Sequence, residues 1–394
     1  MIKRIFRYLQ LQKVGAFELF AALYPILSGY SYGPLHGNII FILILAVWAL
    51  FKKRKHFKTL WLNVLIAFVL VHEFFLMLLI PVPGYFLNNT ISIALISISI
   101  LPICRAINFE KFAGSLNWVA IMTIGGLVYQ AMIVFAGGIV TPLKLPFMPA
   151  MDATTRLYEE VVRPTSFFWE PASFVTFLMV PLFISLLRKT YVWSGIIILS
   201  MFLSTSSTGI LMSFIILALY LMSQKVKMRT RIMVVVLGIG LAFALVKSSY
   251  FEAGINKIEN TDIESNIRLM NGIYLFESMD AGELILGFKA PNVEDFAYMR
   301  HVPLLGRGAF VPTFWLTWAK YGIFGLAILL TMYLSFIRAD RTTLPYVVVL
   351  IIAMSFQSIS FGSSTFAYQL IFLYSYINRN YITQRLTRWQ KVIR

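Results

Sequence analysis

The chain has 394 residues, of which 59% are hydrophobic and only 13% are charged, and its mean hydropathy is +0.78. Soluble domains are about one quarter charged, so the composition excludes an ordinary soluble globular protein. The net charge of +17 would indicate a nucleic-acid ligand in a soluble protein. In a membrane protein it follows from the retention of Lys and Arg in cytoplasmic loops, so no nucleic-acid partner is expected.

Apolar runs follow one another along most of the chain. A membrane-spanning helix needs about 20 mostly apolar residues, and shorter runs fit tilted or partial spans. We predict spans at 14–32, 37–51, 59–81, 84–104, 116–138, 165–187, 190–205, 207–224, 232–250, 309–336, 344–360 and 362–378. The predicted fold class is all-α: a polytopic membrane helical bundle with about twelve transmembrane helices, forming a single integral membrane domain over 1–394.

The loops between these spans differ in charge from one side to the other. The loops and termini that would share one side hold 24 Lys and Arg residues, and those on the other side hold 8. The positive-inside rule makes the basic side cytoplasmic and places both termini there. Residues 2–9 and 382–393 mix apolar with basic residues, which predicts short amphipathic helices on an anionic membrane surface.

Two long segments face outward, 139–164 and 251–308. They contain 12 of the 17 acidic residues, and the second has 58 residues. A connection of that length is uncommon without structure of its own. We therefore predict a large structured outer loop over 251–308, and outer loops are a usual place for function.

The stretch RPTSFFWEP, 163–171, leads from the first outer loop into the sixth predicted span. Arg163 lies just outside the span, and Glu170 is expected within its outer part, followed by Pro171. A charged carboxylate in a span costs about 2.5–3.5 kcal/mol, which makes Glu170 a functional candidate with Arg163 as a nearby partner. The alternative is a structural ion pair that fixes the loop to the helix.

The stretch 261–279 predicts a helix inside the large loop, because Thr261 and Glu264 form a capping-box pattern. Glu264 and Arg268 are spaced i, i+4, so a stabilising pair is the alternative to a functional role for Arg268.

Arg300, His301 and Arg307 cluster shortly before the tenth predicted span. Arginine binds phosphate and pyrophosphate through bidentate hydrogen bonds, so this cluster suits an anionic lipid-linked ligand. The alternative for the arginines is interaction with lipid headgroups. His301 is a candidate general base near neutral pH, and the alternative is a solvated loop histidine.

Polar residues also occur within the predicted spans, notably Glu18, His72-Glu73 and Lys320. Each either lines a substrate path or is satisfied within the bundle. The single cysteine, Cys104, excludes an intrachain disulfide and a cysteine-based metal site. No metal or cofactor motif is present, and none is predicted.

Several stretches together resemble the O-antigen and capsule repeat-unit polymerases (Wzy-type) of the O-antigen polymerase and ligase superfamily. The likeness covers about residues 160–330. RPTSFFWEP resembles the family's Arg-x-x-(Gly/Ser)-x-Phe-x-(Glu/Asn)-Pro element. The other stretches are STSSTGIL at 204–211, Asn266-x-Arg268 followed by LILGF at 284–288, and FVPTFWLTWAKYGIFGL at 310–326.

The resemblance implies a metal-independent membrane glycosyltransferase in the bacterial inner membrane, without a cofactor. It would polymerise oligosaccharide repeat units carried on undecaprenyl pyrophosphate at the periplasmic face, for O-antigen, capsule or exopolysaccharide. Its partners would be the lipid-linked donor and acceptor, membrane lipids and a chain-length regulator protein. Arg268 and Arg163, then Arg300 and Arg307, would bind the pyrophosphate, with Glu170 and next His301 as acid–base groups.

The sequence departs from the ligase pattern. Ligases carry a His-Asn pair near the start of the fourth stretch, where this chain has Val311 and Pro312. This favours polymerase over ligase and leaves the base unassigned. An O-antigen ligase and a non-enzymatic lipid-linked oligosaccharide flippase remain the alternatives. A flippase would need charges along a central cavity, whereas most charged residues lie in the loops.

Overall fold

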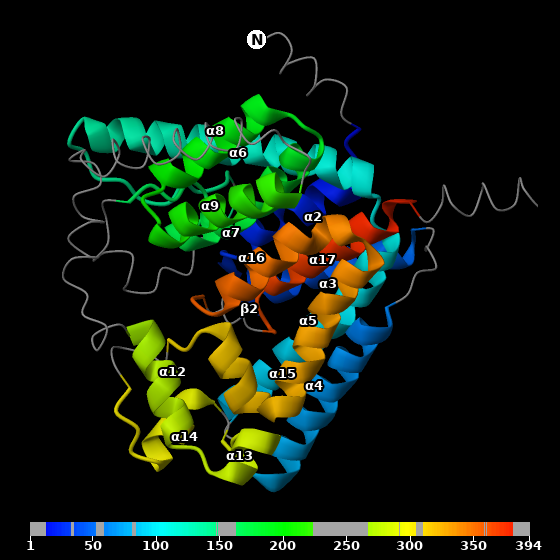
Figure 1. Ribbon diagram of the computed structural model, residues 1–394, viewed down its shortest axis with the longest axis vertical. Helices are drawn as coiled ribbons and strands as arrows, with labels where there is room; N and C mark the ends of the chain where they lie inside the picture. The colour runs from blue at the N-terminus through cyan, green and yellow to red at the C-terminus, as the bar shows by residue number, and fades with distance from the viewer. Residues whose placement is uncertain are drawn as a thin grey trace, which may run out of the picture. The chain divides into compact units, whose positions relative to one another are not determined.

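The computed structural model describes residues 13–32, 35–52, 59–80, 84–146, 148, 163–223, 267–290, 292–304, 310–357, 359 and 361–380. The chain forms two compact units, each assembled from segments far apart in sequence (Figure 1). The first unit is Met1–Trp48, Ile107–Asn260 and Asn378–Ile382. The second is Ala49–Ala106, Thr261–Ile377 and Thr383–Arg394.

The first unit is built around a buried helix, α7. Its elements are α2 (Ala16–Leu27), the two-residue strands β1 (Ser31–Tyr32) and β2 (Leu35–His36), α3 (Gly37–Leu50), α6 (Phe109–Phe135), α7 (Pro171–Leu187), α8 (Tyr191–Leu203), α9 (Ser207–Ser223) and the 3₁₀ turn η5 (Asn378–Asn380). Helix α7 packs against α6, α8 and α9, and almost all of its side chains are buried. A helix that is apolar on every side belongs in the interior, as α7 does.

The second unit combines membrane-type helices with the described part of the large loop. Its elements are α4 (Leu60–Leu79), α5 (Gly84–Ala106), α12 (Ile267–Glu277), α13 (Ala281–Leu286), α14 (Val293–Met299), α15 (Thr313–Ala339), the 3₁₀ turn η4 (Arg341–Thr343), α16 (Leu344–Met354) and α17 (Ser364–Ile377). Helix α4 packs against α15, and α17 packs against α5. Helix α17 is buried continuously from Phe366 to Tyr376.

The all-helical prediction is confirmed apart from the small β1–β2 hairpin. Every predicted span within the described residues contains an α-helix, and the predicted span 232–250 lies outside them, as do both predicted terminal helices. Among the described helices, α4, α6 and α15 are long and apolar enough to cross a membrane, and shorter apolar helices accompany them. These helices are compatible with a membrane protein.

The backbone of α15 is broken at Gly322, where φ is 65° and ψ is −175°. The break lies against the end of α13: a Cβ atom on Gly322 would overlap the carbonyl oxygen of Ile285. Gly287 has a φ of 92°, and a Cβ atom there would likewise overlap the carbonyl oxygen of Lys320. Two glycines therefore let two backbones approach more closely than any side chain would allow.

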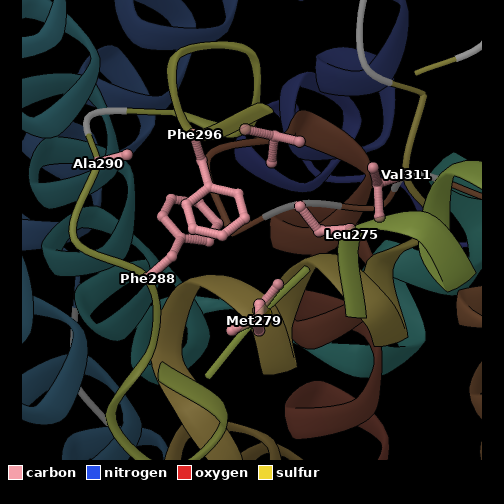
Figure 2. Packing of buried hydrophobic residues seen from close by; sticks show 8 residues of the cluster. Leu275, Met279, Phe288, Ala290, Phe296 and Val311 are labelled. Carbon is pink, nitrogen blue, oxygen red and sulfur yellow. The ribbon is translucent and has the colours of Figure 1, made fainter. Parts of the chain in front are cut away.

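The described part of the large loop has a hydrophobic core of its own. Leu275, Phe288, Phe296 and Val311 are buried together with Ala319 of α15, among other residues (Figure 2). The rings of Phe288 and Phe296 stack with centroids 5.1 Å apart. The described part of 251–308 is thus structured, as α12–α14, and α12 and α13 pack onto α15.

The glycine contact predicts a selective loss of stability. The φ and ψ values of Gly322 belong to a region that is essentially restricted to glycine, at a cost of about 1–3 kcal/mol for other residues. We expect Gly322→Ala to lower the midpoint of thermal unfolding of the purified protein clearly, because the new methyl group also overlaps Ile285. The control is Gly195→Ala in α8, where a Cβ meets nothing within 4 Å and alanine favours the helix. Equal midpoints for the two variants would contradict the close approach.

Candidate functional site

The stretch RPTSFFWEP forms a turn that is fixed to α6 by one buried side chain. The Gln130 carbonyl oxygen accepts the backbone N–H groups of Thr165, at 2.9 Å, and Ser166, at 2.6 Å. The Gln130 amide nitrogen donates to the carbonyl oxygen of Thr141 at 2.6 Å. A buried amide with both ends bonded orders the segments on either side of it.

Ser166 is the sharpest point of this turn, with a left-handed φ of 57°. Its hydroxyl donates to the carbonyl oxygen of Thr123 at 2.6 Å, and its own carbonyl oxygen accepts the N–H of Leu143 at 2.8 Å. A left-handed conformation is uncommon for a residue other than glycine, so Ser166 marks a sharp, specified turn. Phe168 then packs against Phe174 of α7.

The expected place of Glu170 is corrected by this turn. Glu170 does not lie within a helix. It is the N-cap residue of α7, which begins at Pro171, and proline is common at the first position of a helix. Residues 165–170 form the turn because Ser166 leaves the helical region. Arg163 and Glu170, both half-buried, flank this ordered turn at the start of α7.

The other predicted arginines lie in the second unit. Arg268 belongs to the first turn of α12, and its side chain lies outside the described residues. Thr261 and Glu264, the expected cap and pair of that helix, also lie outside them, as does Arg307. Arg163 and Glu170 belong to the first unit and Arg268, Arg300 and His301 to the second, so each half of the predicted site is described by itself.

Arg300 is paired with two carboxylates. Its Nη2 donates to Glu283 at 2.8 Å and to Asp280 at 3.4 Å. Asp280 caps α13 in a capping box with Glu283. The hydrogen bond to Glu283 raises the pKa of Arg300 above its usual value. Arg300 thus holds the end of α14 to the start of α13, a structural contact that the sequence did not reveal.

His301, adjacent to Arg300, ends α14 in a left-handed conformation with φ of 53° and is exposed. Its N–H donates to the carbonyl oxygen of Tyr298, and the N–H of Val302 donates to that of Ala297. This is the Schellman arrangement, in which glycine is usual at the left-handed position. A left-handed backbone is uncommon for histidine, and at this position the imidazole of His301 is exposed to solvent.

A buried charge cluster joins α4 and α15, and the sequence had indicated two of its members, Glu73 and Lys320, as separate signals. Nζ of Lys320 lies 2.6 Å from Oε1 of Glu73, and the side chains are 11% and 2% exposed. The hydroxyl of Tyr321 donates to Oε1 of Glu73 at 2.8 Å, and that of Thr90 donates to Oε2 at 3.0 Å. Both carboxylate oxygens are therefore bonded, as a buried charge requires.

The same place receives the end of the loop helix α13. Nε2 of His72 donates to the carbonyl oxygen of Leu286 at 3.1 Å, and Nε1 of Trp318 donates to that of Leu284 at 3.0 Å. The N–H of Phe288 donates to the carbonyl oxygen of Ala319 at 2.8 Å. His72, adjacent to Glu73, thus connects the charge cluster to the loop.

A signal for this cluster was present in the sequence. Glu73 and Lys320 are opposite charges within apolar spans, and such charges pair with one another when no water reaches them. Their separation along the chain hid which charges would meet. Glu18 has a different partner: its Oε1 accepts the backbone N–H of Asn108 at 3.2 Å.

No protein-family model and no curated protein matches the chain. Among the described residues, no group of three or more His, Cys, Asp or Glu side chains is placed to hold a metal ion. The function has to be inferred from the residues themselves.

The charge cluster predicts a large effect of removing one charge. Glu73→Gln and Lys320→Met each leave the partner charge buried, which costs about 3–5 kcal/mol, whereas the double variant removes both charges and should lose less than either single variant. The measurement is thermal unfolding of the purified protein. Glu110→Gln is the control, because its ion pair with Arg188 has a carboxylate that is 65% exposed and contributes about 0–1 kcal/mol. Single variants no less stable than this control would contradict the cluster.

The cap of α13 predicts an acid-sensitive contact. The N–H of Glu283 bonded to Asp280, and secondarily the Arg300 charge, hold the pKa of Asp280 below its usual 3.8. Because the pKa of Asp280 is lower in the folded state, its ionised carboxylate stabilises the fold. This stabilisation is complete above about pH 4 and is lost as the pH falls through the lower, folded-state pKa. Hydrogen exchange of the α13 amides should accelerate there in the wild type. The asparagine of the variant Asp280→Asn can still cap the helix but does not titrate. Hydrogen exchange of the α13 amides in this variant should therefore lack the acceleration at low pH.

Proposed function

We propose that the chain is a membrane glycosyltransferase that polymerises lipid-linked oligosaccharide repeat units on the outer face of the bacterial inner membrane. The observation that carries the proposal is a contact between two of the resembling stretches. LILGF at 284–288 lies directly against α15, which contains residues 313–326 of the other stretch, through the glycines Gly287 and Gly322. Stretches that are separate in sequence thus form one structural element, as expected if they serve one site.

The proposed topology is the one that the loop charges indicate. It has about twelve spans, both termini in the cytoplasm, and α12–α14 on the periplasmic side. The folded core of these loop helices supports an enzyme over a simple transporter, since a passive connection needs no core of its own.

The proposed reaction is a glycosyl transfer from one carrier lipid to another. A hydroxyl of the incoming repeat unit attacks the anomeric carbon of the growing chain, and the bond from that carbon to undecaprenyl pyrophosphate breaks. A glycosidic bond forms, the hydroxyl proton passes to a base, and undecaprenyl pyrophosphate leaves with the bonding electrons. Arginines stabilise the charge that develops on the leaving group.

The residues divide between these tasks. Arg268 and Arg163 are the first candidates for the pyrophosphate, because both stand in stretches that carry the resemblance, and Arg300 and Arg307 follow them. Glu170 is the proposed acid–base group, since the ordered turn holds it at the start of α7, and His301 is the second candidate. Loss of an acid–base group costs a factor of about 10²–10⁴ in rate.

The test is the length distribution of the surface glycan and of its lipid-linked precursor, separated on gels. Cells lacking the gene are complemented with the wild type, Arg268→Ala, Arg163→Ala, Glu170→Gln or the control Arg188→Ala, each checked for its amount in the membrane. We expect single repeat units in the deletion, a ladder with the wild type and the control, and no ladder with the other three variants. His301→Gly tests the second base without disturbing the left-handed backbone.

Other outcomes would point elsewhere. Long chains that accumulate on the carrier lipid would indicate a ligase. Single units retained on the cytoplasmic side would indicate a flippase, and an unchanged ladder in the deletion would overturn the glycan function altogether.

A further inference from the structure

Four polar backbone groups at the end of α13 are bonded to protein side chains or backbone. The carbonyl oxygens of Leu284 and Leu286 accept from Trp318 and His72. The N–H of Gly287 donates to the carbonyl oxygen of Glu283, at 2.8 Å, and that of Phe288 to Ala319. A surface loop does not need such protein partners, because water forms hydrogen bonds with its terminal N–H and carbonyl groups. In the apolar layer of a membrane each unsatisfied group costs several kcal/mol.

The hydrogen bond from His72 to Leu286 shows how far along α4 the end of α13 lies. His72 lies seven residues before the last residue of α4, Leu79, which is about 10 Å along a helix. The side chains between them include four exposed apolar ones, Phe74, Phe75, Leu78 and Leu79. The end of α13 therefore lies alongside an apolar surface of α4, not beyond the end of that helix.

The side chains of α13 next to this contact are also exposed and apolar. Ile285 is 48% exposed and Leu286 is 61% exposed. The other end of the helix is polar, where Asp280 and Arg300 form their exposed ion pair. Helix α13 thus runs from a charged end to an apolar tip, as a segment that enters a membrane from water would.

We propose that Ala281–Phe288 is a re-entrant segment whose tip, Ile285 and Leu286, contacts the acyl chains of membrane lipids. His72 and Trp318 take the place of water at its carbonyl groups, and Gly287 and Gly322 allow the segment to reach the α4–α15 contact. The exposed apolar residues of α4 make lipid the occupant, since the same acyl chains cover both surfaces. This inference does not depend on the reaction that the chain performs.

The experiment uses the full chain with Cys104→Ala and one spin-labelled cysteine at Ile285, Leu286, Leu78 or Lys289. The protein is reconstituted in vesicles of phosphatidylethanolamine with a minor share of phosphatidylglycerol. Collisions with oxygen, which concentrates in lipid, are compared with collisions with a water-soluble nickel chelate. We expect labels at 285 and 286 to match the α4 position 78, with an oxygen-to-nickel ratio several-fold above that of the exposed loop position 289.

Two results would overturn the proposal. A ratio at 285 and 286 equal to that at 289 would place the tip in water, and labels reached by neither reagent would show that protein covers it. Introducing a charged side chain tests the lipid contact without spin labels. Leu286→Arg should reduce the amount of protein inserted in membranes, whereas Tyr298→Arg in α14, where the side chain is 84% exposed, should not. Equal insertion of both variants would also contradict lipid contact.

Discussion

A carboxylate and an ammonium group cannot remain apart among apolar helices, and the pairing of Glu73 with Lys320 is the constraint on which the second unit depends. The pair joins α4 to α15, and Tyr321 and Thr90 complete the hydrogen bonds of the carboxylate. Removing one charge leaves the other desolvated, so the contact specifies which faces of the two helices meet. The pair is therefore better understood as a device for specificity than as a source of stability.

The loop helices are fixed to the same place. Two glycines remove the side chains that would hold the backbones apart, and His72 and Trp318 bond the carbonyl groups that this approach takes from water. The hydrophobic core around Phe288 then continues from the loop into α15 (Figure 2). A catalytic group on α12 or α14 would thus be positioned by the bundle rather than by a flexible connection, which favours the proposed enzyme.

Much of the helical fold could be predicted because apolar runs alternate with short charged loops, a pattern that needs no knowledge of tertiary contacts. The turn before α7 could not, because no local signal marks the left-handed conformation of Ser166, although Pro171 is a signal for the start of the helix itself. Nor could the pairing of Glu73 with Lys320, because the sequence shows charges but not their distant partners. The carboxylate partners of Arg300 could not be predicted either, because they belong to a cap that only the folded loop brings near.

The central claim is that the loop segment and the helices beneath it form one ordered structure. Hydrogen–deuterium exchange of the full chain in lipid nanodiscs tests this most directly, by comparing peptides from 281–290 with peptides from 60–79 and 323–339. The account predicts that the amides of 283–288 exchange as slowly as those of the helices, because their partners are protein groups. Exchange within seconds, at the rate of a solvated loop, would contradict it.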